Sequence, residues 1–170
     1  MEPDFFLLSA TPHDVNESLS DEHFSFYMRE IEVPRYLKDT RMVERYNLHT
    51  IKFRETKRWG EPLEDGLARV VGENLCRHFH SSSSSIFPNR RKDSLRWDIS
   101  ISFSSFEKHD DLIVMHANWS AKCSDKKIIS DSLLFELKLG NDHSIDTELD
   151  AYNQCLYELA SGIARKLSAE

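Results

Sequence analysis

The sequence has few of the residues that break or cross-link a chain, with five glycines, five prolines and three cysteines in 170 residues. This scarcity excludes collagen-like, low-complexity and disulfide-dense proteins. It also has no run approaching the roughly 20 apolar residues of a membrane-spanning helix. Its start, Met1-Glu2-Pro3-Asp4, lacks the charged and apolar regions of a signal peptide. Residues 1–170 are therefore predicted to form one soluble globular domain.

Positive charge is also scarce, because 22 Lys and Arg residues stand against 29 Asp and Glu residues, for a net charge of −7. Nucleic-acid binding depends on Lys and Arg contacts to phosphates, so no nucleic-acid partner is expected. One basic cluster, Arg90-Arg91-Lys92, follows Pro88 and Asn89 in a predicted turn. A solvated loop is the favoured interpretation, and contact with anionic lipid headgroups or an acidic partner is the alternative.

Cys76, Cys123 and Cys155 are odd in number and widely spaced, without the CxxC spacing of metal or redox sites. We interpret them as buried free thiols, with a single disulfide as the alternative. No G-x-S-x-G, P-loop, G-x-G-x-x-G or H-E-x-x-H motif occurs. Motifs of enzymes and cofactor sites are thus missing, although an acid/base pair assembled from distant segments would leave no local signature.

Two groups of residues contain histidines that could take part in metal binding or acid/base chemistry. His78 and His80 are two residues apart and point in different directions on a helix, so they are not expected to share a metal. The segment His109-Asp110-Asp111 has the residue types of an acid/base site, but adjacent residues in a turn usually supply solvated polarity. A small hydrolase that uses these three residues is kept as the less favoured function.

Apolar periodicity predicts the elements of the first half of the chain. Strands are expected over residues 4–10, 24–33, 41–46 and 49–54, with a polar connection over 12–22. The first of these reads as a buried strand that ends at a Thr11-Pro12 turn. The second changes its apolar face near Arg29-Glu30, which predicts a β-bulge. The last two form a predicted hairpin around Asn47.

A first helix follows, because apolar residues repeat at three and four positions from Leu63 to Phe79. Pro62 is placed at the first helical position, where its missing N–H costs nothing. The five serines from Ser81 to Ser85 are predicted to form a mobile loop.

The second half predicts three strands and a helix. Residues 95–103 alternate strictly between apolar and polar, and 112–123 and 128–139 are further strands joined by short turns. The last helix is predicted to begin near Thr147, with Thr147 and Asp150 at capping-box spacing. The expected fold is α/β, bordering on α+β: a three-layer sandwich with a mixed sheet, a C-terminal antiparallel meander and two main covering helices.

Three tryptophans, Trp59, Trp97 and Trp119, are expected to fill the core, with an apolar groove as the alternative. Trp59 precedes the first helix, and its ring is expected to dock against that helix in the manner of a hydrophobic staple.

Two segments carry a family resemblance. Arg58-Trp59-Gly60-Glu61-Pro62-Leu63 and, further on, Arg69-Val70-Val71-Gly72-Glu73-Asn74-Leu75 resemble the R-W-A-E-P-L and R-V-L-A-E-N-L motifs of PqiC/YmbA-type lipoproteins, the ABC-type transport auxiliary lipoprotein components. The opening Phe5-Phe6-Leu7-Leu8 is similar to the family's Y-Y-x-L strand. The resemblance extends over nearly all of residues 1–170, which are expected to be a single domain of this type. In one departure, Lys38-Asp39-Thr40-Arg41 replaces D-R-P-Q.

The resemblance implies a non-enzymatic lipoprotein without cofactors. It would lie in the periplasm, held by an N-terminal lipid anchor to the inner leaflet of the outer membrane. No lipobox cysteine lies near Met1, so we expect that an anchor-bearing segment has been removed. Such a protein would dock an MCE-domain protein of a lipid transporter, and a homo-oligomeric ring is expected. A periplasmic carrier that itself binds phospholipid is the alternative.

The partner surface is expected at the family motif. Its candidate residues are Arg58, Trp59, Glu61, Pro62, Leu63, Arg69, Glu73 and Asn74.

Overall fold

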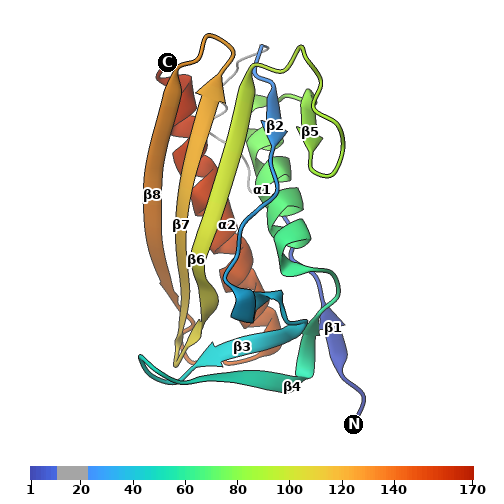
Figure 1. Cartoon of the computed structure of the whole chain (residues 1–170). Coiled ribbons are helices and arrows are strands. Elements are labelled where there is room, and N and C mark those ends of the chain that lie inside the picture. The colour runs from blue at the N-terminus through green and yellow to red at the C-terminus, as the bar shows by residue number, and fades with distance from the viewer. Residues whose placement is uncertain (11–22) are drawn as a thin grey trace.

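The computed structural model describes residues 1–10 and 23–170, and shows an eight-stranded mixed sheet with two helices packed on it (Figure 1). Both helices lie against the same face of the sheet. The predicted mixed sheet, C-terminal meander and two covering helices are confirmed, and with both helices on one face they form one helix layer on one sheet layer. The expected Thr11-Pro12 turn and the polar connection over 12–22 lie outside the described residues.

The meander is formed by three long antiparallel strands, β6 (Trp97–His109), β7 (Leu112–Cys123) and β8 (Ile128–Lys138). Side chains alternate between the two faces of a strand, so the apolar set of β6 and β7 faces the helices and is buried. The polar set, including Ser100 and Ser102, lies on the opposite face. The predicted strands and their turns are thus confirmed.

The N-terminal strand β1 (Asp4–Phe6) pairs in parallel with the end of β4 (Ile51–Trp59). It was predicted to be buried, and this is wrong for the strand itself, because β1 lies at the edge of the sheet with Phe5 exposed. The residues that follow it, Leu8 and Ala10, are buried. An edge strand has a neighbouring strand on one side only, so fewer residues are available to cover its side chains.

The expected hairpin is present, with β3 (Arg41–Arg45) antiparallel to β4. Strand β4 continues to Trp59, beyond the predicted end at Arg54. It is extended because Arg58 is paired with Phe5 of β1 on one side and with Arg41 of β3 on the other. This end of β4 therefore joins the first strand to the hairpin.

Strand β2 (Phe26–Met28) is parallel to β6, and beyond it the chain follows β6 as an irregular segment. The amide of Arg29 donates to the carbonyl of Ile99 (2.9 Å), and the amide of Glu32 donates to that of Ile101 (3.1 Å). Three residue steps on one strand thus match two on its neighbour. This is the extra residue of a β-bulge, as the change of apolar face predicted.

The serine run is not a loop throughout, because strand β5 (Ser84–Ile86) begins within it and pairs in parallel with β2. The hydroxyl of Ser81 donates to the carbonyl of Phe24 (2.6 Å), which fixes the start of the run. The prediction of a mobile loop is therefore wrong for Ser84 and Ser85. Composition alone did not reveal the free edge of β2 that pairs with them.

Helix α1 (Leu63–Phe79) begins one residue after Pro62, which is the cap rather than the first helical residue. Helix α2 (Ile145–Ser168) is capped by Ser144, whose side chain accepts a hydrogen bond from the amide of Thr147. The predicted cap at Thr147 is therefore wrong by three residues. A short 3-10 helix, η1 (Arg35–Lys38), leads from the bulged segment into β3.

A histidine joins the two helices. Nε2 of the buried His78 in α1 lies 2.9 Å from the hydroxyl of Ser161 in α2, and its ring packs near that of Tyr157. Burial lowers the pKa of His78, and the positive charge of Arg165 lowers it further. The neutral imidazole is therefore the form that the folded protein favours.

Acidification is expected to weaken this joint. Above pH of about 6.5 His78 is neutral in both the folded and the unfolded chain. Below that pH the unfolded chain takes up a proton that the folded protein resists, so stability falls until the lowered folded pKa is passed. Urea unfolding between pH 7.5 and 5 should give a shallower pH dependence for His78→Gln than for the wild type. The difference has an upper limit of about 1.4 kcal/mol per pH unit. Parallel curves would contradict this prediction.

Candidate functional site

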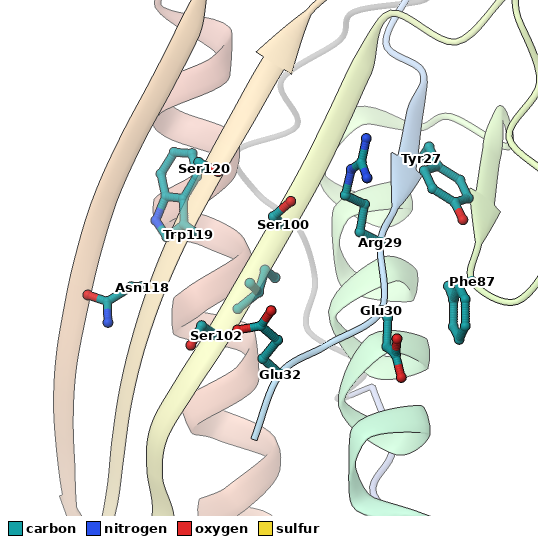
Figure 2. Close-up of a pocket in the computed structure, with 11 residues that line it drawn as sticks. Tyr27, Arg29, Glu30, Glu32, Phe87, Ser100, Ser102, Asn118, Trp119 and Ser120 are labelled. Carbon is teal, nitrogen blue, oxygen red and sulfur yellow. The ribbon is translucent and has the colours of Figure 1, made fainter. Parts of the chain in front are cut away.

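A groove of about 740 Å³ lies on the face of the sheet that the helices leave open (Figure 2). It is bounded by the bulged segment after β2 on one side and by the surface of β6 and β7 on the other. The lining residues are Tyr27, Arg29, Glu30, Glu32, Phe87, Ser100, Ile101, Ser102, Asn118, Trp119 and Ser120. Its size is in the range of ligand and peptide sites.

The floor of the groove consists of small polar side chains in cross-strand pairs. Ser100 is opposite Ser120, and Ser102 is opposite Asn118. Ile101 and Trp119, which are also opposite one another, are buried and belong to the alternate, helix-facing set. The floor is thus flat and offers hydroxyl and amide groups for hydrogen bonds.

One wall is fixed by a salt bridge between the bulged segment and β6. Nε of Arg29 lies 2.5 Å from Oδ1 of Asp98, and a second guanidinium nitrogen lies 3.0 Å from Oδ2. The hydrogen bonds that Arg29 donates to Asp98, together with the negative charge of Asp98, raise the pKa of Arg29. This bidentate pair holds the guanidinium beside the groove and uses two of its five donors.

Two carboxylates flank the same wall. Figure 2 shows Glu32 directed toward Ser102 on β6, and Glu30 on the other side of the segment, where Phe87 lies. The extra residue of the bulge lets the consecutive residues Arg29 and Glu30 both line the groove, and Glu32 follows by the normal alternation of side chains. With Arg29, Asp98 and Arg91, which lies 3.5 Å from Asp98, three negative charges accompany two positive charges. The remaining negative charge suits a partner surface that is polar and positively charged.

The family motif lies away from this groove, where it fastens the N-terminal segment to the fold. The amide of Gly60 donates to the carbonyl of Phe6 (2.8 Å), and the guanidinium of Arg69 donates to the carbonyl of Leu8 (3.1 Å). Arg69 also forms a salt bridge with Glu61. Directly after Leu8, the amide of Ser9 donates to Oδ1 of Asn153 in α2 (3.0 Å). These contacts bring β1, α1 and α2 together.

The eight predicted surface residues differ in exposure. Trp59, Leu63 and Asn74 are buried, Arg58, Glu61 and Arg69 are half-buried, and Pro62 and Glu73 are exposed. The ring of Trp59 packs edge-on against Tyr152 of α2, with centroids 5.5 Å apart. Trp59 also borders a small cavity together with Leu63 and Gly66 of α1, so its docking against the first helix stays a prediction, to which the structure adds a contact with the last helix. A partner-binding role for these residues stays a prediction.

Sequence reasoning missed a buried ionic cluster around Glu107. This carboxylate is 0% exposed and accepts hydrogen bonds from the hydroxyl of Tyr36 (2.9 Å) and from Nε of Arg45 (3.0 Å). The amide of Phe106 donates to the same group (2.9 Å), and Nε2 of His109 lies 3.5 Å away. Burial and the charge of Glu107 raise the pKa of Tyr36 to about 12. The cluster joins η1, β3 and β6. Because these elements are far apart in the sequence, no local sequence pattern predicted it.

The segment weighed for hydrolase chemistry lies in the β6–β7 turn. His109 faces Glu107, and Asp111 lies 3.6 Å from the ammonium of Lys138. Asp110 has a left-handed backbone with φ of 49°, as tight turns often require. The neighbouring residues are thus engaged with different parts of the protein rather than directed at one point.

The remaining candidates have ordinary surroundings. In the basic cluster, Arg90 and Lys92 are exposed, and the guanidinium of Arg91 donates to the carbonyl of Leu95 (3.0 Å). Within the described residues no group of three or more His, Cys, Asp and Glu side chains could hold a metal ion. No helix in residues 1–10 and 23–170 combines the length and apolar character needed to cross a membrane. The three cysteines, Cys76, Cys123 and Cys155, are free thiols.

A protein family and several solved structures match nearly the whole chain. The family model described as "ABC-type transport auxiliary lipoprotein component" matches residues 6–164. A crystal structure of an uncharacterized protein superposes with a TM-score of 0.81 at 15% identity, over 98% of this chain and 99% of the other. A protein from Xanthomonas campestris superposes with a TM-score of 0.68 at 12% identity, over 96% and 90%. No curated protein has a sequence that matches this chain significantly.

Proposed function

Because this chain belongs to the family of ABC-type transport auxiliary lipoprotein components, to which the PqiC/YmbA-type lipoproteins also belong, we propose that it docks an MCE-domain protein of an intermembrane lipid transport system. The match over residues 6–164 is the observation that carries the proposal. Family membership supports a transporter as the partner and the cell envelope as the location. In this proposal the chain binds and positions its partner and performs no catalysis.

The open groove supports docking as the mode of action. It is lined by fixed charges and by small hydroxyl and amide groups, which suit recognition of a polar protein surface. A carrier that encloses an acyl chain needs an apolar cavity, whereas Trp59, Trp97 and Trp119 are all buried in the core. Docking is therefore favoured over the phospholipid-carrier alternative.

Membrane attachment and assembly complete the proposal. An acyl anchor upstream of β1 would hold the domain to the inner leaflet of the outer membrane, in the periplasm, because several acyl chains bind a bilayer much more firmly than one. Copies of the chain would form a homo-oligomeric ring around the partner's lipid path. Each copy would then present its groove to the same partner.

Charge reversal in the groove provides the test. Glu30→Lys combined with Glu32→Lys is expected to weaken binding to the soluble part of the MCE-domain protein from the same organism by about tenfold or more, because like charges would face one another. Biolayer interferometry with the wild-type chain immobilised gives the reference affinity. The matched control is Asp146→Lys combined with Asp150→Lys, which makes the same change in net charge at two exposed positions on α2.

Several outcomes would count against docking. Equal affinity for the groove variant and the wild type would contradict the groove as the contact surface. An undetectable wild-type interaction would contradict the docking function itself. Native mass spectrometry of the purified chain covers the alternative, since phospholipid at near one-to-one stoichiometry would favour the carrier.

A further inference from the structure

Apolar side chains are exposed at the end of the molecule that carries the N terminus. Leu48, between β3 and β4, is 86% exposed, and Tyr46 beside it is 49% exposed. On and after β1, Phe5 is 63% exposed and Leu7 is 58% exposed. Figure 1 shows β1 and the N terminus at one side of this end, and the β3–β4 hairpin running across it so that its tip lies at the other side. With Met1, this end holds five of the eight large hydrophobic side chains that are exposed in the described residues.

The hairpin tip is held in shape, so the exposure of Leu48 is built into the fold. The amide of Tyr46 donates to the carbonyl of Thr50 (2.9 Å), and the amide of His49 donates to Oδ1 of Asn47 (2.8 Å). A guanidinium nitrogen of Arg45 lies 3.4 Å from the carbonyl of Leu48. Backbone groups that are already paired cost less to move into an apolar medium than free ones. The tip is therefore prepared for contact with lipid.

The surroundings of the tip have the character of a membrane interface. The ammonium of Lys52 lies over the ring of Tyr46, 4.3 Å from its centroid. Tyrosine rings and lysine stems with polar ends are typical of the headgroup region of bilayers. A cleft of about 310 Å³ between the tip and the β6–β7 turn has a mainly apolar lining, with Arg45 and His109 among its polar groups beside Tyr46 and Leu48.

We propose that the β3–β4 hairpin tip inserts into the lipid interface, with Leu48 as the penetrating side chain and Tyr46 and Lys52 at headgroup depth. The inference rests on the membrane anchoring stated under the proposed function, because an anchor upstream of β1 brings this end of the molecule to the bilayer. A projecting leucine next to the anchored end fits a soft lipid surface, whereas a protein partner would be met by the groove on the open sheet face.

Insertion at the tip would fix the orientation of the domain. An acyl anchor attached through a flexible segment leaves the domain free to rotate, and a second contact on another element removes that freedom. The hairpin lies across the anchored end of the molecule in Figure 1, while β6, β7 and β8 rise away from it. The groove would consequently stand clear of the membrane and face the partner.

Depth-dependent fluorescence quenching tests the insertion. The full chain, tethered to phosphatidylcholine vesicles by an N-terminal hexahistidine tag and a nickel-chelating lipid, is compared as Leu48→Trp and Leu134→Trp. Leu134 is a matched control, because it is 62% exposed on β8. The three native tryptophans are buried and supply a constant background. Brominated phosphatidylcholine should quench the tryptophan at position 48 several-fold more than the one at 134. Equal quenching at both positions would overturn the proposal.

A second pair of variants adds no tryptophan to the three native ones. With the tagged chain and phosphatidylcholine vesicles that carry too little nickel-chelating lipid to retain all of it, Leu48→Asp should lower the floated fraction, and Leu134→Asp should leave it unchanged. The same loss in both variants would also overturn the proposal. Loss of MCE-partner binding with intact quenching would reject only the docking function. Partner binding without selective quenching at position 48 would reject only the insertion.

Discussion

Replacement of Arg45 with methionine is expected to lower the free energy of unfolding by about 3–5 kcal/mol, because it leaves the carboxylate of Glu107 charged and buried without its guanidinium partner. Glu107 is fully buried, and Arg45 lies 3.0 Å from it. Methionine preserves most of the apolar stem of the arginine, so the change removes mainly charge and donors. Urea unfolding followed by circular dichroism at pH 7 measures the difference.

A double variant separates the charge effect from general disruption. Glu107→Gln in the Arg45→Met background removes the buried charge and retains an amide that can bond the hydroxyl of Tyr36. Most of the lost stability should return, because the desolvation cost of the carboxylate disappears with its charge. A double variant no more stable than Arg45→Met would show that the ion pair is not the source of the loss.

Trp59→Ala is expected to cost about 3–5 kcal/mol of stability, since truncation of a buried aromatic side chain leaves a cavity. The ring of Trp59 is packed edge-on against Tyr152 and is buried where β4 leads into α1. Trp59→Phe should cost less than half as much, because it keeps an aromatic ring in the site. Thermal and urea unfolding measure both variants.

Glu73→Ala, compared with Trp59→Ala, tests whether the family motif serves as a partner surface, as a structural element, or as both. Glu73 is exposed on α1, so Glu73→Ala should change stability by less than about 0.5 kcal/mol. If Glu73→Ala weakens partner binding while Trp59→Ala acts through stability alone, the motif has both a surface and a structural part. A Trp59→Ala variant as stable as the wild type would refute its structural role.

Strands with local patterns could be predicted from the sequence. Apolar and polar residues alternate from Trp97 to Phe103, and this pattern can be read from consecutive residues. In the structure the apolar residues form the buried face of β6 and the polar residues form its open face. The bulge near Arg29 was predicted for the same reason, because a slip in the alternation is itself local. The family resemblance came from residue identities rather than from periodicity, and the family match confirms it.

Features that depend on neighbours could not be predicted. The apolar run at Phe5 indicates a strand but does not show that it will lie at an edge. Ser84 looks like loop until the free edge of β2 pairs with it. Ser144 and Thr147 are equivalent cap signals, and the choice was made by Asp142, which accepts hydrogen bonds from the amide of Ser144 (2.9 Å) and the hydroxyl of Thr147 (2.6 Å).

The candidate groove could not be predicted because it joins segments far apart in the sequence. Arg29 and Asp98 are separated by 69 positions, yet they form one wall of the groove. The bulge was predicted as an interruption of a strand, and nothing in the sequence indicated that its two glutamates would flank a polar floor. Glu107 is similar, since its partners lie 62 and 71 residues away. Contacts of this kind are set by topology rather than by pattern.

The way the first ten residues are fastened has a mechanical consequence. A pull on the N terminus, directed along β1, loads the hydrogen bonds between β1 and β4 together in shear instead of opening them one after another. Behind that strand, tension is passed to α1 through Arg69 and to α2 through Asn153. Force at this end is thereby distributed over both helices, and the domain is built to resist detachment from whatever holds its first strand.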